Sequence, residues 1–296
     1  MMDEYKPADA AAQTDTPDTD LSRRGFTALS ITAGAAISAA TVAHAQAADV
    51  VETNVMIQTA DGIADAALYH PKGKGPWPGV VMFVDVLGLR PAFRDMGRRL
   101  ASSGYTVLVP NPFYRTRKAP VIEGPFDFAN PADFAKLTPL RAPLTPDAVA
   151  RDEATWISYL DRQPTVSKKA KMGVAGYCMG GPMVMQTAAL APARIGASIS
   201  CHGGGVVTDK PDSPHLLAAK IKAKSYFAIA ANDAMRQPDQ KDKLLAAFAA
   251  AANPCGAEVY EGADHGWCVP DGASYNKPQA ERAWAEMLKL YKSALV

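Results

Sequence analysis

The most informative stretch of the sequence is Gly176-Tyr177-Cys178-Met179-Gly180-Gly181. Apolar residues at 172–175 precede it and predict a short buried strand, whereas residues 182–190 follow it and predict a helix. Glycine at 176 and 180 lets a strand and a helix approach closely, because neither position carries a side chain. The stretch therefore predicts a tight strand–turn–helix unit that raises the Cys178 side chain above the end of a strand.

Cys178 has the chemistry of a nucleophile at this position. Unpaired amides and the positive dipole end of the following helix favour a thiolate over a thiol. The backbone amide of Met179 also becomes available to stabilise an oxyanion. A glycine two residues before and after the nucleophile, between a strand and a helix, is typical of a nucleophile elbow, in which serine is more usual. The alternative is a glycine-rich turn that holds an inert, buried cysteine.

Strand and helix patterns alternate along the chain on both sides of this unit. Asp61-Gly62 predicts a hairpin turn between strands at 53–57 and 64–69. Further strands are expected at 80–84, 105–109, 195–200, 226–230 and 257–261. Helices are expected at 93–102, 147–162, 239–252 and 275–295. This alternation predicts an α/β fold, a mostly parallel doubly wound sheet with helices on both faces, in one domain.

Residues 111–146 interrupt the alternation. They contain many prolines and several aromatic residues, and they show no steady hydrophobic period. Since a loop of this length in a compact enzyme is usually functional, we expect it to border the active site.

Asp233 and His265 each come directly after a predicted strand. Ligands collect at the carboxyl ends of the strands in a doubly wound sheet, so both side chains should lie on the same rim as Cys178. His265 would take the thiol proton and later protonate the leaving group, while Asp233 would fix the histidine tautomer. Asp264 is the alternative partner of the histidine, but it is too close in sequence to turn easily under the same ring.

The chain resembles the dienelactone hydrolase family over about residues 52–293. The resemblance is carried by Gly176–Gly181, the Asp233 loop, His265-Gly266-Trp267, Tyr275, Ala283-Trp284, Val84–Gly88 and Val109–Tyr114. It implies an α/β-hydrolase fold and a Cys-His-Asp triad that opens a lactone or small ester through a Cys178 thioester, without a cofactor. The alternatives are a general carboxylesterase or thioesterase, and a non-hydrolytic redox protein in which Cys178 pairs with Cys201.

The same resemblance implies an oxyanion hole formed by the backbone amides of Met179 and Val86. Family members commonly have glutamate where this chain has Asp85, and that acid influences the resting thiol. Asp85 is one methylene shorter, and the alternative is a plain residue at a strand end.

Three further residues are candidates for contact with the substrate. His202 follows the strand predicted next to the elbow strand, so it either lines the pocket or holds a loop through a backbone bond. Tyr114 belongs to the long loop, and Trp267 lies two residues after His265. For each of them, the alternative is that the side chain supports the fold and does not contact the substrate.

One residue departs from the family pattern. Family members that open dienelactone hold the substrate carboxylate with arginines, one of them four residues after the histidine. Because this chain has Val269 there, we expect it to be a poor dienelactone hydrolase in the strict sense. The candidates to replace the missing arginine are Arg115, Arg117 and Arg141.

Residues 1–45 predict a twin-arginine-type export signal. Ser22–Phe26 contains two adjacent arginines and then an aromatic residue, and Ala43-His44-Ala45 has the form of a signal-peptidase site. The weakly apolar stretch at 27–42 has only 16 residues and is rich in Ala and Gly, so a stable membrane anchor is not expected. We therefore expect export by the twin-arginine machinery, cleavage before Gln46, a hydrolase domain at 46–296 and a periplasmic location.

Composition narrows the range of partners and cofactors. The formal net charge is only +1 and no basic cluster is dense, which argues against nucleic acid. The four cysteines lack the clustered spacing of a zinc site, so no metal is assigned, and the sequence does not tell whether any two are bonded. An apolar fraction of 48% is enough for a sizeable core, as in an ordinary globular enzyme.

Overall fold

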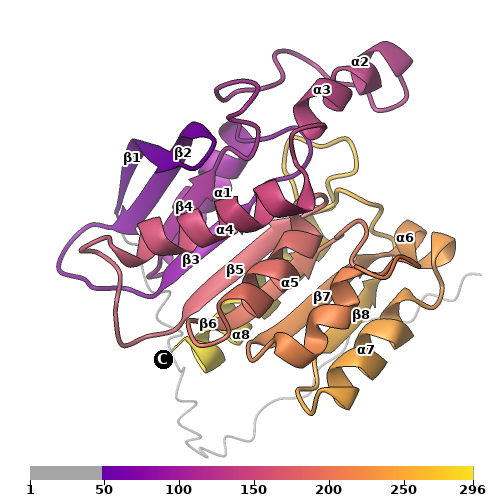
Figure 1. Cartoon of the computed structure of the whole chain (residues 1–296). Helices are drawn as coiled ribbons and strands as arrows, with labels where there is room; N and C mark the ends of the chain where they lie inside the picture. The colour runs from indigo at the N-terminus through magenta and orange to yellow at the C-terminus, as the bar shows by residue number, and fades with distance from the viewer. Residues whose placement is uncertain (1–48, 296) are drawn as a thin grey trace, which may run out of the picture. The chain divides into compact units, whose positions relative to one another are not determined.

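A computed structural model of the chain describes residues 49–295, and the predicted export signal lies outside them. The chain forms one eight-stranded sheet with the order β1-β2-β4-β3-β5-β6-β7-β8 (Figure 1). The strands are β1 (Val50–Thr59), β2 (Gly62–Pro71), β3 (Gly79–Phe83), β4 (Thr106–Pro110), β5 (Met172–Tyr177), β6 (Ile195–Cys201), β7 (Lys224–Ala230) and β8 (Gly256–Tyr260). The helices are α1 (Pro91–Ser102), α2 (Pro131–Ala135), α3 (Leu137–Arg141), α4 (Pro146–Asp161), α5 (Gly180–Leu190), η1 (Pro214–Lys220), α6 (Ala231–Arg236), α7 (Gln240–Ala250) and α8 (Lys277–Ala294).

The sheet is mostly parallel, as the alternation of strand and helix patterns predicts. Strand β1 pairs antiparallel with β2, and β2 pairs antiparallel with β4, whereas every pair from β4 to β8 is parallel. Strand β5 therefore lies between β3 and β6 in the parallel part of the sheet. Its carboxyl end, where the elbow begins, faces the same edge as the carboxyl ends of both neighbours.

Helices cover both faces of the sheet, so the predicted doubly wound fold is confirmed. Buried residues of α1 and α8 belong to the core on one face, and those of α4, α5, η1 and α7 belong to the core on the other. Figure 1 shows α4, α5 and α7 on the near face. The α1 residues Phe93, Met96 and Leu100 recur at helical spacing and are buried, and each contributes about 2 kcal/mol by leaving water.

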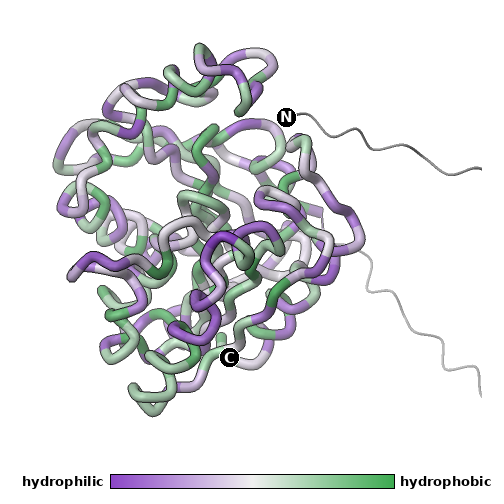
Figure 2. The backbone as a smooth tube through the Cα atoms, turned by 90° about the vertical axis from the view of Figure 1, so that its right-hand side faces the viewer, coloured by the Kyte–Doolittle hydropathy of each residue, from purple (hydrophilic) through white to green (hydrophobic). Residues whose placement is uncertain are grey.

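The central strands are buried on both faces. Every residue of β3, β4 and β5 is buried, which explains their continuous apolar runs. Figure 2 shows hydrophobic stretches of the backbone running through the middle of the domain and hydrophilic residues in many of its outer loops. No helix among residues 49–295 is long and apolar enough to cross a membrane.

The glycines of the elbow are required by close contacts. A Cβ atom on Gly176 would lie 2.1 Å from the carbonyl oxygen of Gly180, and one on Gly180 would lie 2.7 Å from Phe83. Both distances are far below a van der Waals contact, so only glycine lets α5 begin this close to β5 and β3.

Four short helices were not expected from the sequence. They are α2, α3, α6 and η1, each of seven residues or fewer, which is too short for a helical period to be visible. Helices α2 and α3 lie within the proline-rich loop, where Asn130 caps α2 through a bond from the Ala132 amide to its side-chain oxygen. In Figure 1 they stand beyond the edge of the sheet, at the top.

Candidate active site

Cys178 lies at the sharp turn between β5 and α5. Its backbone has a φ of 52°, a left-handed conformation that is unusual for a residue with a side chain. The Cys178 amide donates to the carbonyl oxygen of Cys201 on β6 at 3.2 Å. The Cys178 carbonyl oxygen accepts from the amides of Gly181 and Gly204 at 3.0 and 3.1 Å. These three bonds hold the strained turn and place the side chain at the edge of the sheet.

The structure brings His265 and Asp233 together at this edge. Asp233 lies in the first turn of α6, directly after β7, and its Oδ2 is 2.6 Å from Nδ1 of His265. The neighbouring Asn232 accepts a bond from the His265 backbone amide at 2.9 Å. Asp264 is exposed, and its side chain makes no hydrogen bond within the part of the chain that the structure describes. Two adjacent residues of α6 therefore fix both the backbone and the ring of His265.

His265 carries a proton at neutral pH in this arrangement. Burial disfavours the imidazolium, but hydrogen bonds to Asp233 and to the Cys178 side chain outweigh it and raise the pKa of His265 from 6.5 to about 10. Cys178 and His265 line the same cleft, and the interaction with Cys178 contributes to the raised pKa of His265, so acid, imidazole and thiol lie together. Such a set can supply a nucleophile and a proton donor to the same bond.

The amides of Met179 and Val86 lie in the same cleft as Cys178. Neither amide has a hydrogen-bond acceptor within residues 49–295, although the adjacent Leu87 amide donates to the Asp85 carboxylate. Two unpaired N–H groups beside a nucleophile are what a developing oxyanion requires.

Asp85 is held by an ion network that the sequence analysis missed. Both oxygens of Asp85 accept from the Arg90 guanidinium, at 2.7 and 2.9 Å, and the same guanidinium donates twice to Asp271. Arg90 is largely buried, which strengthens these charged bonds. Asp271 follows His265 in the same loop, so Arg90 ties the loop containing Val86 to the loop containing His265. No local signal in the sequence indicates this pair, because 181 residues separate Arg90 from Asp271.

His202 lies beneath the ring of His265. The two rings meet edge to face with centroids 5.1 Å apart, and His202 is only 1% exposed. Burial, with a smaller effect of His265, holds the pKa of His202 well below its usual value, so its ring is neutral. His202 lines the cleft, and its ring makes no hydrogen bond to any residue that the structure describes.

Trp267 and Tyr114, two of the candidates for substrate contact, do not line the cleft and take the structural alternative instead. Trp267 is fully buried, stacks on Tyr260 at 5.1 Å and supports His202 from behind. The hydroxyl of Tyr114 bonds Thr59 and Asp152, each at 2.8 Å. Both aromatic side chains are used in packing, since buried rings gain most by filling the interior.

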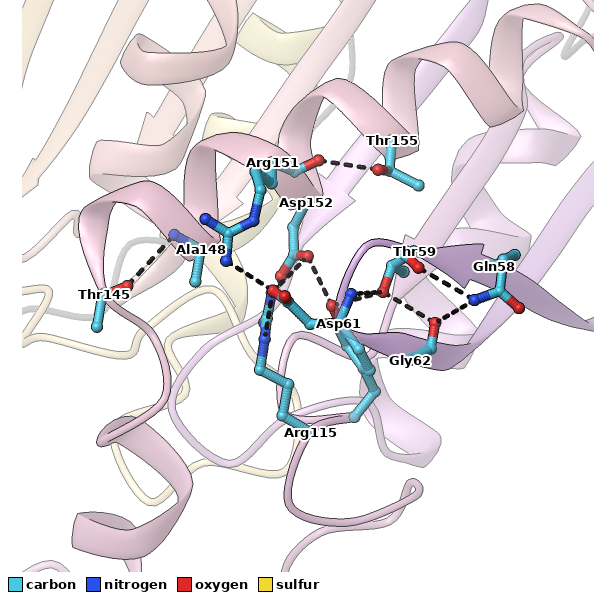
Figure 3. Close-up of polar contacts among 11 residues, drawn as sticks. Gln58, Thr59, Asp61, Gly62, Arg115, Thr145, Ala148, Arg151, Asp152 and Thr155 are labelled. Atoms are coloured by element: carbon cyan, nitrogen blue, oxygen red, sulfur yellow. Dashed lines mark hydrogen bonds and ion pairs between the residues drawn. The ribbon is translucent and has the colours of Figure 1, made fainter.

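Arg115 is also directed away from the cleft. Its guanidinium donates twice to Asp152 on α4 and twice to Asp61 in the β1–β2 turn, and Arg151 shares Asp61 (Figure 3). Arg117 donates to the carbonyl oxygen of Val121. Of the three arginines suggested by the sequence, Arg141 alone lines the cleft.

The cleft has a volume of about 790 Å³ and is bordered by the long loop, as expected. Phe128 and Phe134 line it from the loop and are more than half exposed. Val269 is buried in its wall, while Arg236 lines it from α6 with a side chain that is 74% exposed. A volume of this size accommodates a small organic molecule.

Neither a metal site nor a disulfide is present in the described part of the chain. No group of three or more His, Cys, Asp or Glu side chains between residues 49 and 295 is arranged to hold a metal ion. The four cysteines are free, and Cys201 and Cys268 are buried.

The fold and this site define the class of protein. An eight-stranded, mostly parallel sheet carries a nucleophile elbow after a central strand, with an acid after β7 and a histidine after β8. The order nucleophile, acid, histidine on such a sheet is that of an α/β hydrolase.

Comparisons with known proteins agree with this class and narrow it. The sequence model of the dienelactone hydrolase family matches residues 64–295. The chain is 26% identical to a Methylorubrum extorquens protein provisionally named a carboxymethylenebutenolidase, over 94% of this chain and 95% of that one. It is also 26% identical to a carboxymethylenebutenolidase of Rhodococcus opacus, over 67% of this chain and 73% of that one.

A solved structure shows the same fold. A provisionally named dienelactone hydrolase from Klebsiella pneumoniae superposes with a TM-score of 0.71 at 24% identity, over 82% of this chain and 99% of the other. The chain therefore belongs to the dienelactone hydrolase family, and it is a hydrolase that acts on esters.

Proposed function

We propose that the enzyme hydrolyses a lactone or small carboxylic ester through a thioester on Cys178. The observation that carries the proposal is the chain of contacts from Asp233 through His265 to the Cys178 side chain. His265 accepts the thiol proton as the sulfur attacks and holds it for the leaving group, and the raised pKa of His265 favours a ring that holds this proton.

The reaction then takes two steps. The Cys178 sulfur bonds to the carbonyl carbon, and the amides of Met179 and Val86 hold the oxyanion. When the intermediate collapses, the bond from carbon to the leaving oxygen breaks, and that oxygen takes the Nε2 proton of His265. Water next attacks the thioester carbon and gives a proton to His265. The bond from carbon to sulfur then breaks, the acid product leaves, and the sulfur takes its proton back from His265.

The substrate we propose is an uncharged lactone or ester. Val269 contributes an apolar wall, and Arg115 is held by two aspartates away from the cleft. Arg141 and Arg236 line the cleft, but exposed arginines bind a carboxylate weakly because water screens them. Dienelactone, which carries a carboxylate, should therefore be turned over no better than an uncharged lactone of similar size.

The experiment compares wild-type enzyme with Cys178→Ala and Cys255→Ala. Cys255 lies outside the cleft and serves as the matched control. We expect Cys178→Ala to lose at least a thousandfold in kcat/KM for p-nitrophenyl acetate, and rapid quench with mass spectrometry should detect an acyl group on Cys178 of the wild type. Substantial activity in Cys178→Ala, or an acyl group on another residue, would exclude the proposed nucleophile.

We also propose that the enzyme is exported to the periplasm by the twin-arginine machinery. The support is the sequence alone, in the paired Arg23 and Arg24 and the Ala43–Ala45 cleavage pattern. Replacing both arginines with lysine should leave uncleaved precursor inside the cell, as an antibody against the enzyme would show in fractionated cells. Normal export of this variant would exclude the twin-arginine route.

A further inference from the structure

A second cavity lies beside the active-site cleft. It has a volume of about 470 Å³ and lies between α3 and the first turns of α5. Its apolar wall is formed by Leu144, Val149, Met179, Pro182 and Met183. We call it the α3–α5 groove. Its polar side chains, such as Thr138 and Gln186, leave most of the lining apolar, which suits a hydrocarbon ligand.

The groove adjoins the cleft, because Arg141, Met179 and Pro182 line both cavities. Met179 directly follows the nucleophile, so the groove begins where the oxyanion would form. The Met179 side chain is half-buried and packs against two apolar clusters, one beneath α4 and α5 and one beneath α3. An unbranched methionine changes shape at little cost, which lets an apolar group pass from the cleft into the groove.

The position of His265 determines which part of an ester reaches the groove. The leaving alcohol must lie against His265, since that residue protonates its oxygen. The groove has no lining residue from the His265 loop or from α6. At Cys178 the acyl substituent and the leaving oxygen occupy different corners of the tetrahedral carbon. The substituent that enters the groove is therefore the acyl chain.

We propose that the α3–α5 groove is the acyl-binding subsite of this enzyme and accepts an unbranched apolar chain. Helix α5 rises about 10 Å from Met179 to Gln186, enough for a chain of roughly six to eight carbons. This inference rests on hydrolysis through Cys178 and goes beyond it by naming the acyl group. It predicts a preference for medium-chain esters over acetate esters.

The expected gain follows from the apolar surface that the chain buries. Each fully buried methylene strengthens binding about fourfold. In a partly open groove we expect a gain of about twofold for each methylene. From acetate to octanoate, kcat/KM for p-nitrophenyl esters should rise by at least tenfold after division by the uncatalysed rate. A matched series of acetate esters with longer alcohols should show no such rise.

The variant that tests the site is Ala142→Trp. Ala142 lines the groove but not the cleft, and it is exposed, so an indole there fills the groove without disturbing the core. The control is Ala135→Trp, at an exposed position of the neighbouring α2 that lines neither cavity. We expect Ala142→Trp to remove most of the wild-type advantage of octanoate over acetate, measured as the ratio of the two kcat/KM values, and Ala135→Trp to leave this ratio unchanged.

The outcomes are distinct. A wild-type enzyme that hydrolyses acetate through Cys178 without gaining from longer acyl chains would overturn the subsite and leave the proposed function intact. An octanoate advantage that survives Ala142→Trp would overturn it too, as would a gain confined to the alcohol series. Absence of any turnover that depends on Cys178 would overturn the proposed function and the subsite together.

Discussion

Asp233→Asn tests how the carboxylate supports His265. The pKa of His265 rises from 6.5 to about 10, which corresponds to about 5 kcal/mol at 1.36 kcal/mol per pKa unit, contributed by both Asp233 and Cys178. If about half of this comes from Asp233, its loss removes about 2 to 3 kcal/mol, or on the order of a hundredfold in kcat/KM. The two side chains are less than a third exposed, so solvent screening reduces this only modestly.

The assay is steady-state hydrolysis of p-nitrophenyl acetate, with Asp264→Asn as the matched control. Asp264 adjoins His265 in sequence but is exposed, so we expect its variant to stay within about twofold of the wild type. Retention of more than a tenth of the wild-type kcat/KM in Asp233→Asn would refute the orienting role. A larger loss in Asp264→Asn would transfer that role to Asp264.

The same substitution should change how stability depends on pH. Since the pKa of His265 is raised on folding, the folded state binds more protons than the unfolded state between about pH 6.5 and 10. The stabilisation is complete below this window and is lost as the pH rises through it. Urea unfolding at pH 6.5 and 9.5 should show a smaller decrease for Asp233→Asn than for the wild type. An equal decrease would show that Asp233 does not set the pKa of His265.

Two further predictions concern the scaffold of the site. Gly176→Ala should lower the free energy of unfolding by about 3 kcal/mol or prevent folding, because the new Cβ would meet the Gly180 carbonyl. The control is Gly204→Ala, where the Cβ has open space, and thermal unfolding should show no such loss for it. Glu153 is 1% exposed, its carboxyl oxygens have no hydrogen-bond partner among the described residues, and burial raises its pKa well above 4.5. The wild type should therefore lose stability as the pH rises above 4.5, and Glu153→Gln should gain about 1 kcal/mol or more at pH 8 but not at pH 4. Equal urea midpoints for wild type and Glu153→Gln at pH 8 would contradict this.

The parts of the fold that local patterns specify were predictable. Continuous apolar runs gave the positions of the central strands, because strands buried on both faces need no polar residue. The spacing of glycines around Cys178 predicted the elbow, since the close contacts at Gly176 and Gly180 admit no other residue. Asp233 and His265 could be assigned to one edge because both directly follow parallel strands.

Local patterns could not predict where the polar side chains of the loops point. Tyr114 ends a matched signature and Arg115 begins the unmatched loop, yet both are bound by Asp152 of α4, a contact that depends on how the loop folds back. Helices α2 and α3 have only five residues each, so no helical period can be recognised in their sequence. The α3–α5 groove depends on the position of α3, so it could not be predicted from the sequence either.

The site combines parts that are fixed in different ways. Cys178 is placed by the strand and helix that it joins, so its position follows from nearby residues. His265 depends on Asn232 and Asp233, which hold its backbone and ring from another strand end.

The amide of Val86, proposed to bind the oxyanion, depends on a still longer connection. The neighbouring Asp85 is held by Arg90, and Arg90 also binds Asp271 from the His265 loop. A buried bidentate pair keeps its geometry better than a single hydrogen bond. Because one guanidinium contacts both loops, a shift of the His265 loop would move the oxyanion amide with it. The Val86 loop and the His265 loop are therefore linked through Arg90, whereas the Met179 amide is held in the same turn as Cys178.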